Sequence, residues 1–385
     1  MIEIDLRLAL FCDSYLPQLN GVSLLLERLV DAVRDRGGMV RVFTTTDPHA
    51  TYDPEIRRWP SVPLWLYPEH RLALPTPASI RRELDAWRPT IVHAASPFGL
   101  GLAARRGARA LGIPFVSSYH TSWSAYTKFY GLGFLSNFAW RYLRWFHNSG
   151  DRTYAPTEAT RQELEFHGVR RTAIWSRGVD TVRFTPSARS SALRARLGAS
   201  DNTVVCAYVG RLGAEKGLAV AMEGMHRVVA RAGANVVCAI AGDGPYEAEC
   251  RRLAPPGTIF MGRLSGRELS EFYASADVFI FPSATDTFGN VILEAMASGL
   301  PVVGADVGPT RELLSNTRGL TFPQGNAEMF GDQVLSLVLD RARRVVLARE
   351  ALAFARTRTW DAIFDELFAD YARLSGSAPA AVAVA

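Results

Sequence analysis

The chain has 385 residues, of which 48% are hydrophobic and 21% charged, with a formal net charge of +5. This length exceeds one typical core and suits two globular domains, and the net charge permits an anionic partner without identifying one. No stretch approaches the roughly 18 unbroken apolar residues of a membrane span. The first apolar run, MIEIDLRLALF, has no basic start and predicts a buried strand, not a signal peptide. The four cysteines lack CxxC spacing, which predicts buried thiols in a reducing compartment and neither zinc nor disulfides.

The first half of the chain alternates apolar strands with amphipathic helices, which predicts a parallel α/β organisation. We expect a strand over residues 7–12, a helix over 22–36, a strand over 39–45 and an irregular proline-rich stretch over 47–77. Asn20 and Gly21 lie where the first loop meets its helix. The missing side chain of Gly21 would let a diphosphate approach the backbone, and a simple turn glycine is the alternative.

Further strands are predicted over 90–94 and 113–119. The run GLGLAA over 99–104 imitates a dinucleotide fingerprint, but no acid follows within about 20 positions to hold a ribose. We therefore interpret it as helix–sheet packing. His120 closes its strand at the carboxyl edge of the sheet, where ligands bind in such folds, although a lone histidine is often structural.

Residues 123–146 are rich in aromatic side chains, interleaved with Lys128, Arg141 and Arg144, and contain no acid. Three interpretations stay open. The aromatic rings can pack in the core, or the segment can lie on an anionic membrane surface. Nucleic acid is the least favoured partner and is not expected, because no recognised nucleic-acid module accompanies the segment.

The stretch RGVDTVRFTPS, which begins at Arg177, predicts the passage between two domains, and a second α/β unit begins at Thr203. Arg211 and Lys216 bracket the loop RLGAEKG at the end of its first strand. Two cations there can neutralise a diphosphate, above all as it leaves, and a solvated loop pair is the alternative. The next strand ends in a turn at the same edge, formed by Gly242, Asp243, Gly244 and Pro245.

Residues 277–306, DVFIFPSATDTFGNVILEAMASGLPVVGAD, predict one strand–loop–helix–strand unit. Asp286 lies in its loop, and Glu294 follows in the first part of the helix, with seven residues between the two acids. The free N–H groups and positive dipole at the helix start suit a phosphate or a sugar oxygen. Capping and dipole compensation are the alternative roles for the two acids.

Several of these stretches resemble motifs of the GT-B retaining glycosyltransferases of family four. The matching pieces are the NGV loop, the HT pair, the RGVD linker, VGRLGAEKG, AGDGP and TDTFGNVILEAMASGLPVV. The resemblance implies an α/β GT-B fold, with two Rossmann-like domains facing each other across a cleft. We expect an acceptor-side domain over 1–180, a donor-binding domain over 188–358, a final helix over 360–374 that packs back on the first domain, and a flexible tail over 375–385.

The resemblance also implies roles for individual residues. Arg211 and Lys216 would hold the donor diphosphate, Asp286 the sugar hydroxyls and Glu294 the ribose. The usual first acid of the family is Glu, so Asp286 reaches about one methylene less far. His120 would contact the transferred sugar. The remaining donor contacts would come from Asn20, Gly21, Gly242, Asp243, Gly244, Leu264 beside the nucleobase, and the backbone of Phe288, Gly289 and Asn290.

The implied reaction moves a hexose from a nucleoside-diphosphate sugar with retention at the anomeric carbon. The linker and the SATDTFGNV run look most like bacterial mannosyltransferases, which favours GDP-mannose and a lipid-linked or glycolipid acceptor. The alternatives are UDP-sugar transfer (glucose or sulfoquinovose) to diacylglycerol, and a GT-B protein that only binds or epimerises nucleotide sugars. A hydride-transfer enzyme and a hydrolase-like carboxylate pair fit less well.

The leaving diphosphate would take the acceptor's proton, so no protein nucleophile and no cofactor are expected. The sequence has no D-x-D, which predicts metal independence. We expect a cytoplasmic protein with peripheral contact to the inner face of the plasma membrane through residues 123–146.

Overall fold

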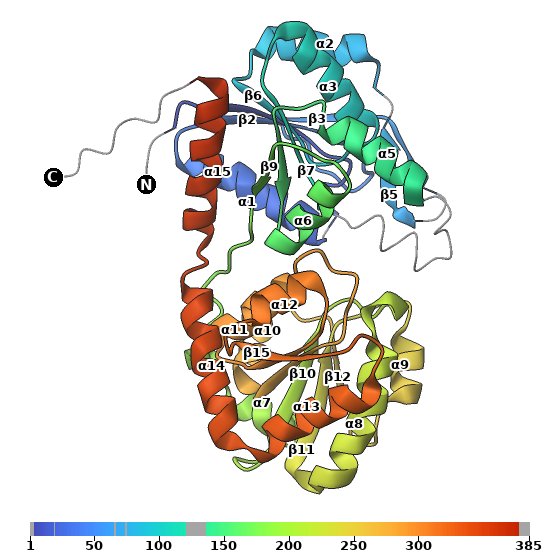
Figure 1. Cartoon of the computed structure of the whole chain (residues 1–385), viewed down its shortest axis with the longest axis vertical. Helices are drawn as coiled ribbons and strands as arrows, with labels where there is room; N and C mark the ends of the chain where they lie inside the picture. Colours follow the sequence, from blue (N-terminus) through green and yellow to red (C-terminus); the bar gives the residue numbers. More distant parts are fainter. Residues whose placement is uncertain (1–3, 19, 65–66, 74, 121–135, 377–385) are drawn as a thin grey trace, which may run out of the picture. The chain divides into compact units, whose positions relative to one another are not determined.

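The computed structural model describes residues 4–18, 20–64, 67–73, 75–120 and 136–376. It divides into two compact units, Met1–Ser176 together with Asp361–Ala385, and Arg177–Trp360. Each unit is a parallel α/β sheet covered by helices (Figure 1). Residues 121–135, which include part of the predicted aromatic stretch 123–146, lie outside the described residues, as do residues 377–385 of the predicted tail 375–385.

The first unit is built on a seven-stranded sheet in which all neighbouring strands are parallel. Its order is β3 (Ile56–Trp59), β2 (Met39–Thr45), β1 (Arg7–Phe11), β6 (Ile91–Ala94), β7 (Phe115–Ser118), β8 (Arg152–Ala155) and β9 (Thr172–Ile174). The direction of strand addition reverses between β1 and β6. Such a reversal opens a crevice at the carboxyl ends of the two strands, where α/β proteins bind ligands.

The region predicted to be irregular, 47–77, contains three strands in the part that the structure describes. These are β3 on the sheet edge and an antiparallel hairpin of β4 (Ser61–Leu64) and β5 (Tyr67–Ala73). The prediction was therefore wrong there. The β3 sequence is IRRW, whose residues are all half-buried, so it lacks the apolar run that marks the central strands.

Six helices among the described residues of the first unit cover its sheet. They are α1 (Gly21–Asp35), α2 (Pro77–Trp87), α3 (Gly99–Leu111), α5 (Ser136–His147), α6 (Glu158–Phe166) and α15 (Trp360–Ser375). The GLGLAA run opens α3, and a Cβ on Gly101 would lie 2.0 Å from the carbonyl oxygen of Ser96. This close contact with the preceding loop gives the run a packing role.

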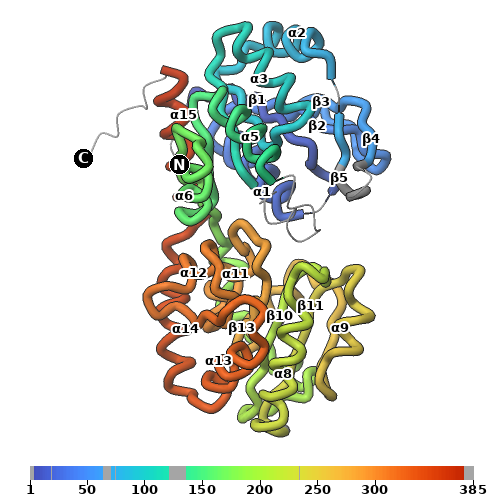
Figure 2. Tube along the Cα trace, turned by 45° about the vertical axis from the view of Figure 1, so that its right-hand side comes forward, coloured from blue at the N-terminus to red at the C-terminus, as the bar shows by residue number. Residues whose placement is uncertain are grey.

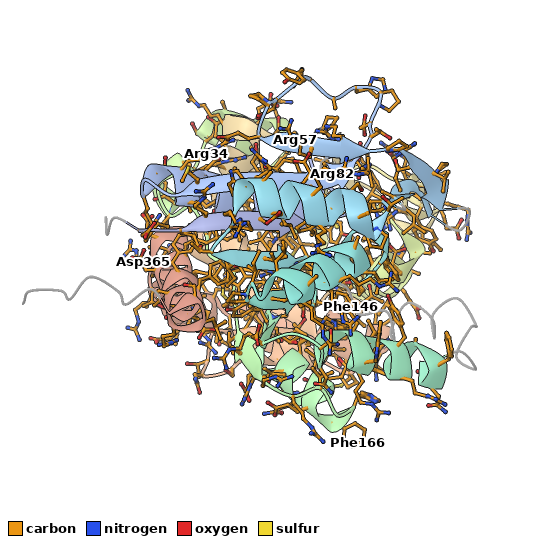
Figure 3. All side chains as sticks on the ribbon, turned by 90° about the horizontal axis from the view of Figure 1, so that it is seen from above. Arg34, Arg57, Arg82, Phe146, Phe166 and Asp365 are labelled. Atoms are coloured by element: carbon orange, nitrogen blue, oxygen red, sulfur yellow. The ribbon has the colours of Figure 1, made fainter. Side chains whose placement is uncertain are left out.

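The last helix, α15, lies among the elements of the first unit although it ends the described chain (Figure 2). Buried Arg36, at the end of α1, pairs with Asp361 and Asp365 of α15 at 3.0 and 2.8 Å (Asp365 is labelled in Figure 3). Asp370 accepts from the Tyr154 hydroxyl at 2.8 Å and pairs with Arg152. These contacts attach α15 to both α1 and β8.

The second unit contains a six-stranded parallel sheet with one reversal of strand order, between β10 and β13. Its order is β12 (Ile259–Gly262), β11 (Val236–Ala241), β10 (Val204–Val209), β13 (Val278–Phe281), β14 (Val302–Ala305) and β15 (Gly319–Phe322). Its α-helices are α7 (Ser191–Arg196), α8 (Leu218–Ala232), α9 (Glu247–Leu253), α10 (Gly266–Ser275), α11 (Asn290–Ala297), α12 (Gly308–Leu314), α13 (Ala327–Leu339) and α14 (Arg341–Arg356).

Alternating residues of the second sheet face two different cores, as strand geometry requires. Val205 and Ala207 of β10 pack on the side of α10, α11 and α14, whereas Cys206 and Tyr208 pack on the side of α8 and α13. Both faces are therefore apolar, which explains the unbroken run VVCAYV. All four cysteines are buried free thiols, as predicted.

Candidate active site

Two loops meet at the strand reversal of the second sheet. One follows β10 and contains the short 3-10 helix η3 (Ala214–Lys216), and the other connects β13 to α11. Gly217, with φ of 70°, fixes their approach, because a Cβ there would lie 2.4 Å from the carbonyl oxygen of Pro282. The fold thus brings together the RLGAEKG and TDTFGN motifs, which are far apart in the sequence.

Lys216 and Asp286 meet across this reversal point. The Lys216 Nζ lies 2.7 Å from Asp286 Oδ1, and both side chains are largely shielded from solvent. The other carboxylate oxygen, Asp286 Oδ2, is buried and makes no hydrogen bond among the described residues. An unsatisfied buried acceptor of this kind destabilises a protein by about 1–3 kcal/mol unless a ligand fills it. The Lys216 ammonium group and the unsatisfied Asp286 Oδ2 therefore lie side by side, where one ligand can contact both.

Arg211 is held by Glu215, a partner that the sequence interpretation missed. Their side chains form an ion pair in which Glu215 is almost fully buried and Arg211 is 36% exposed. Gly213 leaves the space for this carboxylate, since a Cβ there would lie 2.4 Å from Glu215 Oε1. Glu215 therefore positions Arg211, while Lys216, the next residue, faces Asp286.

The AGDGP turn packs closely against the RLGAEKG loop. A Cβ on Gly242 would lie 1.9 Å from the Gly210 carbonyl oxygen, and one on Gly244 would lie 2.4 Å from that of Leu212. The Leu212 N–H donates to the Asp243 carbonyl at 2.7 Å. Loop packing is thus a sufficient reason for both glycines, and a direct donor contact by Gly242, Asp243 and Gly244 stays a prediction.

The start of α11 has the features of an anion site. Its N-cap, Gly289, has φ of 90° and provides no side-chain cap to the first-turn N–H groups. The Phe288 side chain is buried in the core, so only its backbone can face a ligand. Asn290 Oδ1 is buried without a hydrogen-bond partner among the described residues. Uncapped N–H groups at a helix start suit a phosphate or an oxyanion.

Glu294 lies one turn into α11 and accepts a hydrogen bond of 2.8 Å from the Tyr273 hydroxyl on α10. Tyr273 is fully buried, and burial together with the neighbouring Glu294 raises its pKa, so the hydroxyl remains a donor. Tyr273 was not predicted as a site residue. Leu264, at the predicted nucleobase position after β12, is half-buried and packs against the core on this face of the sheet.

The predicted residues of the first unit have identifiable structural partners. Asn20 caps α1, accepting from the N–H groups of Val22 and Ser23 at 3.0 and 2.9 Å, and Gly21 is the first residue of that helix. Capping thus occupies the Asn20 carbonyl, and contact of Asn20 or Gly21 with the donor remains a prediction. His120 follows β7, and its Nε2 lies 2.7 Å from the Ser118 hydroxyl. Thr121 lies outside the described residues.

The sequence interpretation missed Asp13, which lies at the strand reversal of the first sheet. It follows β1, and its N–H donates to the Ser96 hydroxyl in the loop after β6 at 3.2 Å. Both carboxylate oxygens are buried and make no hydrogen bond of normal geometry among the described residues. Burial raises the pKa of Asp13 to about 6, while Ser96 and the Leu100 backbone lower it in part. An acid directly after a buried strand was the available signal.

Known proteins match this chain over nearly its whole length. Residues 19–183 match the family described as Glycosyltransferase Family 4, and residues 203–340 match the family described as Glycosyl transferases group 1. The chain is 36% identical to a GDP-mannose-dependent alpha-mannosyltransferase of Mycobacterium tuberculosis, over 96% of this chain and 97% of that relative. It is 32% identical to a sulfoquinovosyl transferase of Arabidopsis thaliana, over 92% of this chain and 71% of that relative.

The chain belongs to glycosyltransferase family 4. Solved structures show the fold of this family 4 enzyme. The crystal structure of Anabaena HepE in complex with UDP and glucose matches with a TM-score of 0.74 at 20% identity, over 95% of this chain and 98% of HepE. WaaG, a glycosyltransferase involved in lipopolysaccharide biosynthesis, matches with a TM-score of 0.70 at 18% identity, over 94% of this chain and 99% of WaaG.

The predicted GT-B class with two Rossmann-like units and the predicted glycosyltransferase activity are therefore confirmed. No cluster of three or more His, Cys, Asp or Glu side chains that could hold a metal ion occurs among the described residues of this glycosyltransferase. Within the same part of the chain, no helix combines the length and the apolar character needed to cross a membrane.

Proposed function

We propose that the enzyme transfers mannose from GDP-mannose to a lipid-linked or glycolipid acceptor, with retention at the anomeric carbon. The observation that carries the donor part is the convergence of Lys216, Asp286 and the uncapped start of α11 at the strand reversal of the second sheet. The choice of sugar is supported by three relatives, 33–36% identical over most of their length, that are named GDP-mannose-dependent alpha-mannosyltransferases.

The mechanism uses the leaving group as the base. The acceptor hydroxyl attacks the anomeric carbon on the face from which the diphosphate departs, the bond from that carbon to the phosphate oxygen breaks, and the hydroxyl proton passes to a diphosphate oxygen. Arg211 and Lys216 neutralise the departing charge, together with the N–H groups at the start of α11. Such groups act most strongly on charge that develops in the transition state, so their removal should lower kcat.

The two carboxylates recognise hydroxyl groups in this proposal. Asp286 Oδ2, which has no partner among the described residues, accepts from a hydroxyl of the transferred sugar. Glu294, oriented by Tyr273, accepts from the ribose. The diphosphate competes with Asp286 for Lys216, so donor binding loosens the ion pair as it fills the open acceptor.

The composition of the chain gives a direct test of donor binding. Lys128 and Lys216 are the only lysines among the 43 basic residues. In a Lys128→Arg variant, reductive ¹³C-methylation therefore labels one side-chain amine and retains its charge. We expect the Lys216 resonance to shift on addition of GDP-mannose at concentrations at which UDP-glucose has little effect. An unchanged resonance with every donor would contradict the role of Lys216.

Activity is tested by nucleotide release from GDP-mannose, UDP-glucose, UDP-galactose and UDP-glucuronate, with and without lipid extract. We expect lipid-dependent release of GDP, reduced about 100-fold or more in Lys216→Ala and Arg211→Ala, as for the loss of one transition-state donor. The control is Arg227→Ala, which removes a surface cation on α8 that pairs with Glu328. Nucleotide binding without release from any donor would instead favour a binding or epimerase protein.

A UDP-sugar donor with diacylglycerol as acceptor is the second candidate. It is supported by the sulfoquinovosyl transferase relative and by an alpha-monoglucosyldiacylglycerol synthase of Streptococcus pneumoniae, 30% identical over 77% of this chain and 70% of that relative. Release of UDP but not GDP in the same screen would decide for it.

The acceptor part rests on the surface of α5. Phe138 and Trp145 are exposed on this helix, and Arg105 of α3 stacks over the Trp145 ring at 4.5 Å. Arg141 and Arg144 are also exposed, so rings and cations share this face of α5. Such a face suits the headgroup region of an anionic membrane. We propose that it lies on the cytoplasmic leaflet and brings the enzyme to a lipid acceptor.

A further inference from the structure

A chain of buried hydrogen bonds connects the last helix to His120 within the first unit. The Tyr371 hydroxyl of α15 makes a short hydrogen bond with His93 Nδ1. His93 Nε2 lies 2.8 Å from the Ser118 hydroxyl, which in turn lies 2.7 Å from His120 Nε2. Tyr371 and His93 are fully buried, and Ser118 is 2% exposed. We call these three residues the relay.

The sheet register explains why the relay forms. His93 on β6 is directly opposite Val116 on β7, so Ser118, two residues further along, faces the same side of the sheet as His93. Ser117 faces the other side, where it contacts His147. Ser118, the last residue of β7, thus places its hydroxyl between His93 and His120.

Aromatic rings enclose the relay. The His93 ring lies 5.4 Å from Trp175 and 5.9 Å from both Tyr154 and Tyr371, measured between centroids. Trp175 also packs edge-on against His120 at 5.5 Å. In such an apolar environment hydrogen bonds are stronger and polarise one another. The loss of the hydrogen bond at one end of the relay therefore weakens the bond at the other end.

The relay has one favoured direction. Burial lowers the pKa of His93 to about 3, so its ring is neutral and has one donor and one acceptor nitrogen. No other acceptor for the Tyr371 hydroxyl occurs among the described residues, so this hydroxyl donates to His93 Nδ1. His93 Nε2–H then donates to Ser118, and the Ser118 hydroxyl donates to His120 Nε2. A neutral His120 therefore carries its hydrogen on Nδ1.

We propose that Tyr371, His93 and Ser118 are positioning residues that fix both the ring orientation and the tautomer of His120, so that activity depends on the docking of α15. The proposal rests on the proposed function, to which it adds the contact between His120 and the transferred sugar that the family resemblance implies. With its hydrogen on Nδ1, His120 acts towards the substrate as a donor and not as an acceptor. A mixed population of tautomers would present the wrong group part of the time.

The test compares Tyr371→Phe with Tyr154→Phe. Both variants remove one buried hydroxyl beside the His93 ring, but the Tyr154 hydroxyl donates to Asp370 and is not part of the relay. The tautomers are measured by long-range ¹H–¹⁵N correlation with ¹⁵N-histidine, and the signals of the seven histidines are assigned with His93→Asn and His120→Asn variants. In the unmodified enzyme we expect the hydrogen on Nε2 of His93 and on Nδ1 of His120.

We expect Tyr371→Phe to mix the His120 tautomers and to lower kcat about tenfold with little change in the donor KM, equivalent to about 1.4 kcal/mol. Tyr154→Phe should leave both readouts unchanged, because Asp370 keeps its ion pair with Arg152 of β8 and α15 therefore stays docked. Ser118→Ala, which also removes one hydroxyl, should likewise release His120 and serves if Tyr371→Phe does not fold.

The proposal is overturned if His120 in the unmodified enzyme carries its hydrogen on Nε2, or if Tyr371→Phe behaves like Tyr154→Phe. A tautomer change without a change in kcat would overturn the link to activity. The nuclear magnetic resonance measurement needs no substrate, so an incorrect donor or acceptor assignment does not affect it.

Discussion

Asp13→Asn tests whether the edge of the first sheet holds a carboxylate in an environment that opposes its charge. The folded-state pKa of Asp13 is about 6, against an ordinary value of 3.8. Below about pH 4 both the folded and the unfolded chain hold the proton, so the shift has no effect on stability. Between about pH 4 and 6 the unfolded chain ionises first, and the free energy of unfolding falls as pH rises.

The size of the effect follows from the shift. At about 1.4 kcal/mol per pKa unit, a rise of about two units corresponds to about 3 kcal/mol of lost stability above pH 6. Asparagine has nearly the same shape and no charge. We therefore expect Asp13→Asn to be more stable than the unmodified protein by up to about 3 kcal/mol at pH 8, and the difference to shrink towards pH 4.

The assay is urea unfolding at a series of pH values, with Asp201→Asn, an exposed turn position, as the control. A stability difference that is the same at pH 5 and pH 8 would refute the reasoning. Transferase activity is measured on the same samples. A more stable but at least tenfold less active Asp13→Asn protein would indicate that the open carboxylate serves substrate binding, because strained functional groups commonly oppose stability.

Further predictions concern the donor-side loops, the metal and the membrane. Gly217→Ala should destabilise the second unit by more than 1 kcal/mol, because it combines a positive φ with a Cβ near the Pro282 carbonyl, and thermal unfolding measures this. Tyr273→Phe should raise the donor KM about tenfold through a less well-oriented Glu294, and an unchanged KM would contradict that role. Chelator should leave activity intact. Trp145→Ser should weaken binding to anionic vesicles, measured by sedimentation, and unaltered binding would remove α5 from the contact.

Local patterns predicted most of both sheets. The central strands are continuous apolar runs because both of their faces are buried, and the helices between them have regular apolar spacing. The strand β3 escaped prediction because its stability comes from pairing with β2 and from charged partners such as Glu83 of α2, which lies 3.6 Å from Arg57. Contacts of that kind leave no periodic signal in the sequence.

The sequence predicted the charged residues of the candidate site but not the residues that they contact. Lys216 and Asp286 are marked by their loops, but their ion pair depends on β10 and β13 being neighbours. Glu215 and Tyr273 act through single contacts within or between elements, which no spacing rule detects. Asn20 carries a local signal that was overlooked, since an asparagine followed three residues later by Ser23 is a capping pattern.

The first unit is made from two pieces of chain, with the whole of Arg177–Trp360 between them in the sequence. Because a protein is synthesised from its N-terminus and its domains fold as units, the second unit is complete before α15 leaves the ribosome. Until then Arg36, His93 and Tyr154 lack the partners that α15 supplies. A chain that stops before α15 would keep its Lys216–Asp286 loops whole, yet it would expose the surface of the first unit that α15 covers. Chaperones and proteases act on such partly folded chains.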